Sequence, residues 1–255
     1  MNHKNSIDTF WRKPKRSAKI IKPFLAGRDI KRYAPLEAER HLIFIPKGFT
    51  NETGSRPRSG WNWLCENYPA IAKYLEPFKK KAQARWDKGD YWWELRACDY
   101  YEDFEKPKII YPNILKQPEF TFDEGRFYSN QKSYIIPLAD KFLLAVLNSS
   151  ITSFFFRMKL PKLRGGFYEP NFVVFKFMPI CRIDEGNKTA VTKRDKIIAL
   201  ADQMLTAQTT LHGAATESDR KLAEQRIAIL DREIDLLVYE LYNLTGEEIG
   251  IVEGK

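Results

Sequence analysis

The chain has few cysteines and histidines and no long apolar run, and these shortages exclude several classes of protein. Its 255 residues include three cysteines and three histidines, all isolated in the sequence. Without a CxxC pair we expect no metal site and no disulfide framework, only reduced thiols in a cytoplasmic protein. No apolar run reaches the roughly 18 residues of a membrane span. The polar start, Met-Asn-His-Lys-Asn, is unlike a signal peptide.

The chain also lacks the sequence motifs of several enzyme classes. It contains no GxxxxGK[ST] phosphate loop, no GxGxxG fingerprint and no GxSxG elbow. Paired acids occur at Glu102-Asp103 and Asp123-Glu124, but both pairs fall in predicted loops and turns, where solvation explains them. The sequence therefore predicts no catalytic residue in this chain.

What the chain does have is an excess of positive charge on an ordinary apolar content. Hydrophobic residues make up 44%, enough for a sizeable core, and 42 Lys and Arg against 33 Asp and Glu give a net charge of +9. This balance favours nucleic acid or another anionic surface as partner, although basic proteins without such a partner share it.

The positive charge is densest in residues 1–33, which hold ten Lys or Arg and two acids. A solvated arm and an arm laid on phosphates both fit this composition, and phosphate contacts would be salt-dependent. The candidate contacts within it are Arg12, Lys13, Lys15 and Arg16.

Short β-branched and aromatic runs alternate with helical patterns up to residue 183. A helical pattern covers 61–86 with interruptions at Pro69 and Pro77, and a second helix covers 142–156 with Asp140 as its N-cap. The predicted strands are 41–45, 107–111, 120–122, 133–136 and a buried strand at 172–177. This order predicts an α+β fold, a mixed-sheet domain with flanking helices over 1–183.

Residues 184–255 carry two long helical patterns. Apolar residues follow the spacing 3-4-3-4 from Ile197 to Leu211 and again from Ile227 to Leu241, with a Gly-containing break at 212–216. Such patterns are typical of an antiparallel helical hairpin with coiled-coil-like seams. We expect it to pack against a partner or to close the domain.

Two predicted loops combine cations, amides and aromatic rings. The first offers Arg126, Tyr128, Asn130, Gln131 and Lys132; the second offers Lys159, Lys162, Arg164 and Tyr168. Arg and Lys can read guanine, and Asn and Gln can read adenine, whereas a phosphate contact needs only charge. For any one of these residues a phosphate or solvent role is the more common one. Gly165-Gly166 fits either an ordinary hairpin turn or a close approach of the backbone to a ligand.

Several sequence pieces, taken in order, resemble one family. The chain is similar to the TaqI-like C-terminal specificity domain of adenine-specific DNA methyltransferases of the type IIG restriction-modification class. The resemblance covers nearly the whole chain and rests on the pieces at 21–33, Trp93-Glu94-Leu95-Arg96, 106–112, 144–150, 163–168 and 233–245.

The resemblance implies target recognition on double-stranded DNA. The family's methyltransferase half carries an Asn-Pro-Pro-Tyr motif for the flipped adenine and a glycine-containing motif for S-adenosylmethionine. This chain has no Pro-Pro pair, so by itself it is expected neither to bind the cofactor nor to methylate. Its expected partners are DNA and a methyltransferase catalytic half, in cis or in trans, with no membrane.

Two alternatives remain open at this point. Half of a type I restriction specificity subunit would share the DNA-reading role and use a long spacer helix to pair with a second copy. A protein-interaction module that does not bind DNA would use its basic surface for solubility alone. Two antiparallel helices favour the type IIG interpretation, and salt-dependent duplex binding would exclude the interaction module.

Overall fold

The computed structural model describes residues 15–51 and 59–255, and for Lys15 only its backbone. The contacts divide the chain into two compact units, which are described separately. The first contains the described residues 15–24, 38–51, 59–102 and 126–128; the second contains 25–37, 103–125 and 129–255. The helical hairpin therefore belongs to the same unit as much of the preceding domain.

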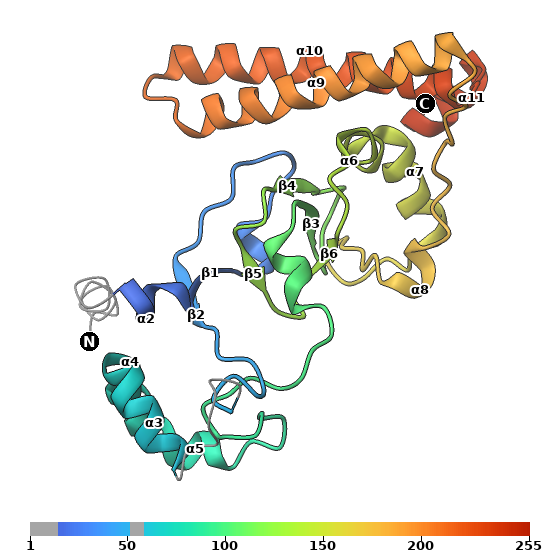
Figure 1. Cartoon of the computed structure of the whole chain (residues 1–255). Helices are drawn as coiled ribbons and strands as arrows, with labels where there is room; N and C mark the ends of the chain where they lie inside the picture. The colour runs from blue at the N-terminus through green and yellow to red at the C-terminus, as the bar shows by residue number, and fades with distance from the viewer. Residues whose placement is uncertain (1–14, 52–58) are drawn as a thin grey trace. The chain divides into compact units, whose positions relative to one another are not determined.

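The first unit holds one small sheet and a group of short helices (Figure 1). The sheet has the order β2-β1-β5, in which Ile21 of β1 lies opposite Ile43 of β2 in an antiparallel register. Its strands are β1 (Ile21–Leu25), β2 (Arg40–Ile43) and β5 (Tyr128–Ser129). Its helices are α2 (Lys15–Lys19), α3 (Gly60–Asn67), α4 (Pro69–Leu75), η2 (Glu76–Phe78) and α5 (Lys79–Gln83).

Prolines divide the helical region of the first unit, as the sequence predicts. Pro69 opens α4 and Pro77 lies in the first turn of η2, positions where a missing backbone N–H costs nothing. The buried faces of these helices meet a tryptophan pair, Trp92 and Trp93.

A buried carboxylate organises the loops beside this core. Glu94 is fully buried, and its two oxygens accept four backbone N–H groups, from Gly48, Thr50, Asp90 and Tyr91. The carboxylate thus replaces the water that these amides would otherwise need.

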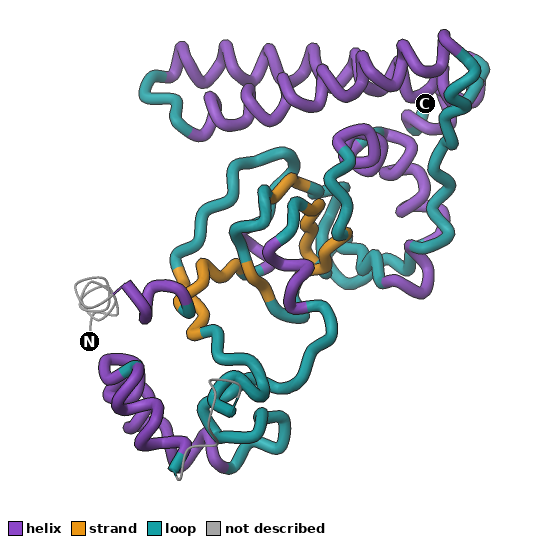
Figure 2. The backbone as a smooth tube through the Cα atoms, in the orientation of Figure 1, coloured by secondary structure: helices purple, strands orange, loops and turns teal. Residues whose placement is uncertain are grey.

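The second unit is built on an antiparallel sheet of order β4-β3-β6. The 3-10 helix η1 (Gly27–Asp29) belongs to this unit, and η3 (Tyr101–Glu105) precedes the sheet. The strands are β3 (Lys108–Pro112), β4 (Thr121–Asp123) and β6 (Ser133–Ile136), close to the predicted positions. Figure 2 shows how short these strands are beside the loops that join them.

The predicted helix 142–156 is two helices, α6 (Lys141–Asn148) and α7 (Ser150–Lys159). The predicted N-cap is confirmed, because Asp140 accepts the Leu143 N–H at 2.9 Å. The break comes at Ser149, whose backbone is extended and whose hydroxyl donates to the Val146 carbonyl. Small polar side chains at 148–150 compete for the backbone groups that a continuous helix would use.

The antiparallel helical hairpin is confirmed. α9 (Lys188–His212) and α10 (Glu217–Leu241) run side by side in Figure 1 and bury the apolar seams that the periodicity predicted. A last helix, α11 (Gly246–Glu253), begins with a capping box between Thr245 and Glu248. No helix in the described part of the chain combines the length and apolarity needed to cross a membrane.

The predicted buried strand at 172–177 is wrong. Phe172–Phe175 form a short helix, α8, because the Asn171 side chain accepts the Val174 N–H at 3.3 Å and turns the backbone. Phe172, Val173 and Phe177 are exposed, and Phe175 alone among the α8 residues is buried. The alternation of apolar residues is typical of a strand, but the N-cap and its local hydrogen bonds determine a helical backbone conformation.

A buried ion pair holds β3 to β4. Lys108 lies opposite Asp123 in the antiparallel register, both side chains are inaccessible to water, and the ammonium donates to the carboxylate and to the Phe104 carbonyl. Burial lowers the pKa of Lys108, and the hydrogen bond and charge of Asp123 raise it only in part.

Removing one partner of this pair is expected to destabilise the fold more than removing both. Lys108→Met leaves the Asp123 carboxylate buried without its cation, which typically costs about 3–5 kcal/mol. The double variant Lys108→Met/Asp123→Leu should recover most of that loss in urea denaturation. A single variant as stable as the parent chain, or a double variant no better than the single one, would contradict this account.

Candidate nucleic-acid interface

Three segments of the second unit form a basic surface, called here the basic loop cluster: residues 113–118, 129–133 and 157–168. Together they contain six cations and no acid. The cations are Lys116, Lys132, Arg157, Lys159, Lys162 and Arg164. Glu119 and Glu169 follow two of the segments directly, and Glu119 pairs with Lys31. The excess of cations still attracts polyanions.

Backbone hydrogen bonds attach the two predicted loops to the same short stretch of chain. The Asn113 N–H donates to the Lys132 carbonyl at 3.0 Å. Two residues further on, Leu115 and Tyr168 exchange both of their backbone hydrogen bonds, at 3.1 and 2.7 Å. The segment that follows β3 therefore brings residues 130–132 and 163–168 together, although more than 30 positions separate Lys132 from Leu163 in the sequence.

Arg164 is placed at the tip of a tight turn. The Leu163 N–H donates to the Phe167 carbonyl at 2.7 Å, and the Gly166 N–H donates to the Leu163 carbonyl at 3.1 Å. Gly165 and Gly166 have φ of +82° and +80°, the left-handed region that glycine enters most easily. Arg164 is exposed at this turn.

The remaining cations of the basic loop cluster have different environments. Lys159 ends α7, and it and Lys162 are exposed. Lys116 is exposed as well, with its Nζ 5.1 Å from the centre of the Phe167 ring. Sequence reasoning missed Lys116, because a single lysine after a strand carries no signal without knowledge of the 115–168 bridge. Arg157 donates to the Val252 carbonyl at 2.5 Å and so holds α11.

The two tyrosines of the predicted site are buried. Tyr128 packs its ring against Phe44, with 4.8 Å between the ring centres, and Tyr168 packs against Phe156 at 5.9 Å. Both were predicted to face a ligand. Each instead fixes the backbone from which exposed neighbours project.

The two amide side chains of the first loop, Asn130 and Gln131, have different environments. Asn130 uses its side-chain oxygen to accept the Lys132 N–H at 3.0 Å, so it shapes its own turn. Gln131 and Lys132 are exposed beside it. Reading adenine requires both the oxygen and the nitrogen of an amide, and Gln131 offers both without dismantling the turn.

Two further predicted residues, Arg126 and Arg16, lie in the first unit. Arg126 is exposed, with its guanidinium 5.8 Å from the Phe127 ring centre. Arg16 donates to the Asn67 side chain at 2.9 Å and lies over the Tyr68 ring, so it ties α2 to the neighbouring helices. Arg12 and Lys13 lie outside the described residues, and Lys15 is described only as part of α2.

Comparison with known families identifies the family of this chain. The sequence model of the TaqI-like C-terminal specificity domain matches residues 22–180, well over half of the chain and all of the basic loop cluster. The chain belongs to this family. The match ends before α9, so the hairpin and α11 lie outside the part that defines the specificity domain.

A solved structure shares the fold of the specificity domain and its hairpin. It is the Type IIL restriction-modification enzyme MmeI in complex with DNA, with a TM-score of 0.57 at 13% identity. The similarity covers 96% of this chain and 31% of that one, so the chain spans under a third of its neighbour's length. The search of curated proteins found no match.

The turn at the tip of the specificity domain's second loop is expected to depend on Gly165. In Gly165→Ala a Cβ would occupy the left-handed region, at a cost of about 1–2 kcal/mol. Amide hydrogen exchange at Leu163 and Gly166 should therefore speed up by roughly 5- to 30-fold.

Gly246→Ala is the matched control, since Gly246 has open space around it, no positive φ, and opens α11. It should leave the two turn amides unchanged. Equal protection of these amides in Gly165→Ala and the parent chain would show that the turn does not need a glycine there.

Proposed function

We propose that the chain is the DNA target-recognition domain of a restriction-modification adenine-N6 DNA methyltransferase, and that it lacks the catalytic half. The observation that carries the proposal is the basic loop cluster, whose loops are hydrogen-bonded through their backbones to the segment 113–118. Family membership and the shared fold with a restriction-modification enzyme bound to DNA support it.

In this proposal the residues divide between phosphate contact and base reading. Lys116, Lys159 and Lys162 hold duplex phosphates, which fixes the position of the domain on DNA. Arg164 enters the major groove from the glycine turn and donates to a guanine, while Gln131 and Lys132 reach the neighbouring base pairs. Arg126 and the basic arm add phosphate contacts.

Chemistry on the adenine belongs to a catalytic half supplied in cis or in trans. That half would bind S-adenosylmethionine and the flipped base, and this chain would choose the site. The segment 184–255, with its hairpin and α11, would dock onto the catalytic half or a neighbouring subunit. The two antiparallel helices favour this arrangement over half of a type I specificity subunit, which would use one long spacer helix.

Duplex binding by the chain should weaken as salt rises. Each phosphate contact contributes about 0.9 to the slope of log affinity against log salt. Lys162→Ala should lower that slope by about one contact, whereas Lys196→Ala, an exposed lysine on α9, should leave it unchanged. Fluorescence anisotropy with a labelled duplex measures both. Affinity that does not weaken between low and moderate salt would count against phosphate contacts, and failure to bind the duplex at all would favour an interaction module.

If Arg164 reads a base, its removal should change which DNA sequences the chain prefers and not only weaken duplex binding. Arg164→Ala should relax selection at one position of the target, with about 1–3 kcal/mol less discrimination there. Selection from a randomised duplex library reads this directly, and Arg220→Ala on α10 is the matched exposed arginine. A uniform loss on every sequence would reduce Arg164 to a phosphate contact.

A further inference from the structure

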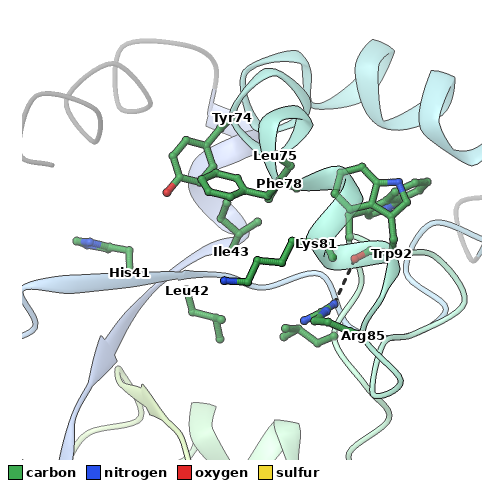
Figure 3. A pocket seen from close by; sticks show the side chains of 12 residues that line it. His41, Leu42, Ile43, Tyr74, Leu75, Phe78, Lys81, Arg85 and Trp92 are labelled. Atoms are coloured by element: carbon green, nitrogen blue, oxygen red, sulfur yellow. Dashed lines mark hydrogen bonds between the residues drawn. The ribbon is translucent and has the colours of Figure 1, made fainter. Parts of the chain in front are cut away.

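A pocket in the first unit has no role in the function proposed above. Its volume is about 400 Å³, within the range of small-molecule sites. It lies between β2, the α4–α5 region and the strip at 92–95 (Figure 3). All of these belong to the first unit, so the pocket does not depend on the placement of the second.

Aromatic rings form the walls of this pocket. Trp92 and Trp93 line it from the core, and Tyr74 and Phe78 line its edge with ring centres 5.7 Å apart. Phe78 lines the pocket with 50% of its surface exposed, and its ring is tilted by 50° from the ring of Tyr74. Open ring faces beside a pocket suit a flat partner that can stack on them.

Positive charge accompanies the rings. Lys81 lines the pocket and lies between Phe78 and Arg85 in Figure 3. Arg85 donates to the carbonyls of Trp92 and Glu94, at 3.2 and 3.0 Å, and thereby fixes the tryptophan wall. Among the described residues, no acid lines the pocket. The lining therefore suits a ligand with a flat ring and a negative charge.

We infer that this pocket binds a single unpaired nucleotide, with the base stacked on Phe78 and the phosphate held by Lys81. A nucleotide supplies both the flat ring and the anion, and stacking with a nearby cation is how proteins hold unpaired bases. The inference rests on the proposed function in taking nucleic acid as the partner. It adds a second contact, made with a base outside the duplex stack.

The inference predicts that the chain prefers a duplex with one bulged nucleotide to the same duplex fully paired. Loss of a stacking ring typically weakens such binding by roughly 5- to 150-fold. Phe78→Leu, which keeps an apolar side chain of similar reach, should abolish the preference and leave binding to the paired duplex unchanged. Lys81→Ala should reduce the preference while the ring remains.

Matched controls lie close to the pocket residues in the sequence. Trp86 is 94% exposed and does not line the pocket, so Trp86→Ala should keep the preference. Lys80 is exposed next to Lys81 and outside the lining, so Lys80→Ala should keep it too. Titration with adenosine monophosphate, followed by tryptophan fluorescence, tests a free nucleotide. Competition with the bulged duplex supports a nucleotide site in this pocket, whereas adenosine monophosphate that binds without displacing the bulged duplex would place the bulged base elsewhere.

The results separate this inference from the proposed function. Equal affinity for bulged and paired duplexes, or an equal loss of preference in Phe78→Leu and Trp86→Ala, would overturn the pocket inference and leave target recognition intact. Failure of the paired duplex to bind in a Lys162-dependent way would instead overturn the proposed function, whatever the bulged duplex does.

Discussion

The second unit depends on one arginine that joins three distant segments. Arg32 donates to the Asp231 carboxylate on α10 at 2.6 Å and to the Asn148 carbonyl at the end of α6 at 2.8 Å. Burial lowers the pKa of Arg32, but the Asp231 hydrogen bond and charge outweigh it and raise the pKa overall. The next residue, Tyr33, has a φ of +54° and donates its N–H to the Phe120 carbonyl. A conformation so unusual for tyrosine persists because these contacts determine it.

From Arg32 a continuous set of contacts reaches the basic loop cluster. Asn148 exchanges two hydrogen bonds with the backbone of Phe120, which precedes β4. β4 pairs with β3 through the Lys108–Asp123 register, and β3 leads directly into residues 113–118. That segment binds both loops through their backbones. Base reading needs side chains held in fixed positions, and short loops on a supported segment provide this better than free loops would.

Sequence periodicity was sufficient for the hairpin, because it is a local signal. Composition located the two basic segments but not their secondary structure, since Tyr128 lies in β5 and Lys159 ends α7. The strand predicted at 172–177 failed where one capping side chain, Asn171, outweighed an alternating pattern. The burial of the two tyrosines could not be predicted for a different reason. A tyrosine in a basic loop looks the same in the sequence whether its ring faces solvent or the core, and only the non-local contacts with Phe44 and Phe156 separate the two cases. Lys116 was missed because its significance depends on a bridge between residues far apart in the sequence.

The sequence pieces that carry the family resemblance have structural roles in this chain. Arg32-Tyr33 joins the hairpin to the sheet, Glu94 gathers backbone amides, Asn148 fixes β4, and Gly165-Gly166 turns the loop. Each role needs a particular residue type, since the partners are backbone groups or buried charges. The exposed side chains beside them, Gln131, Lys132 and Arg164, carry no such constraint. Family membership therefore establishes the scaffold, and in the proposed function the choice of target would fall to a few exposed side chains that the scaffold supports.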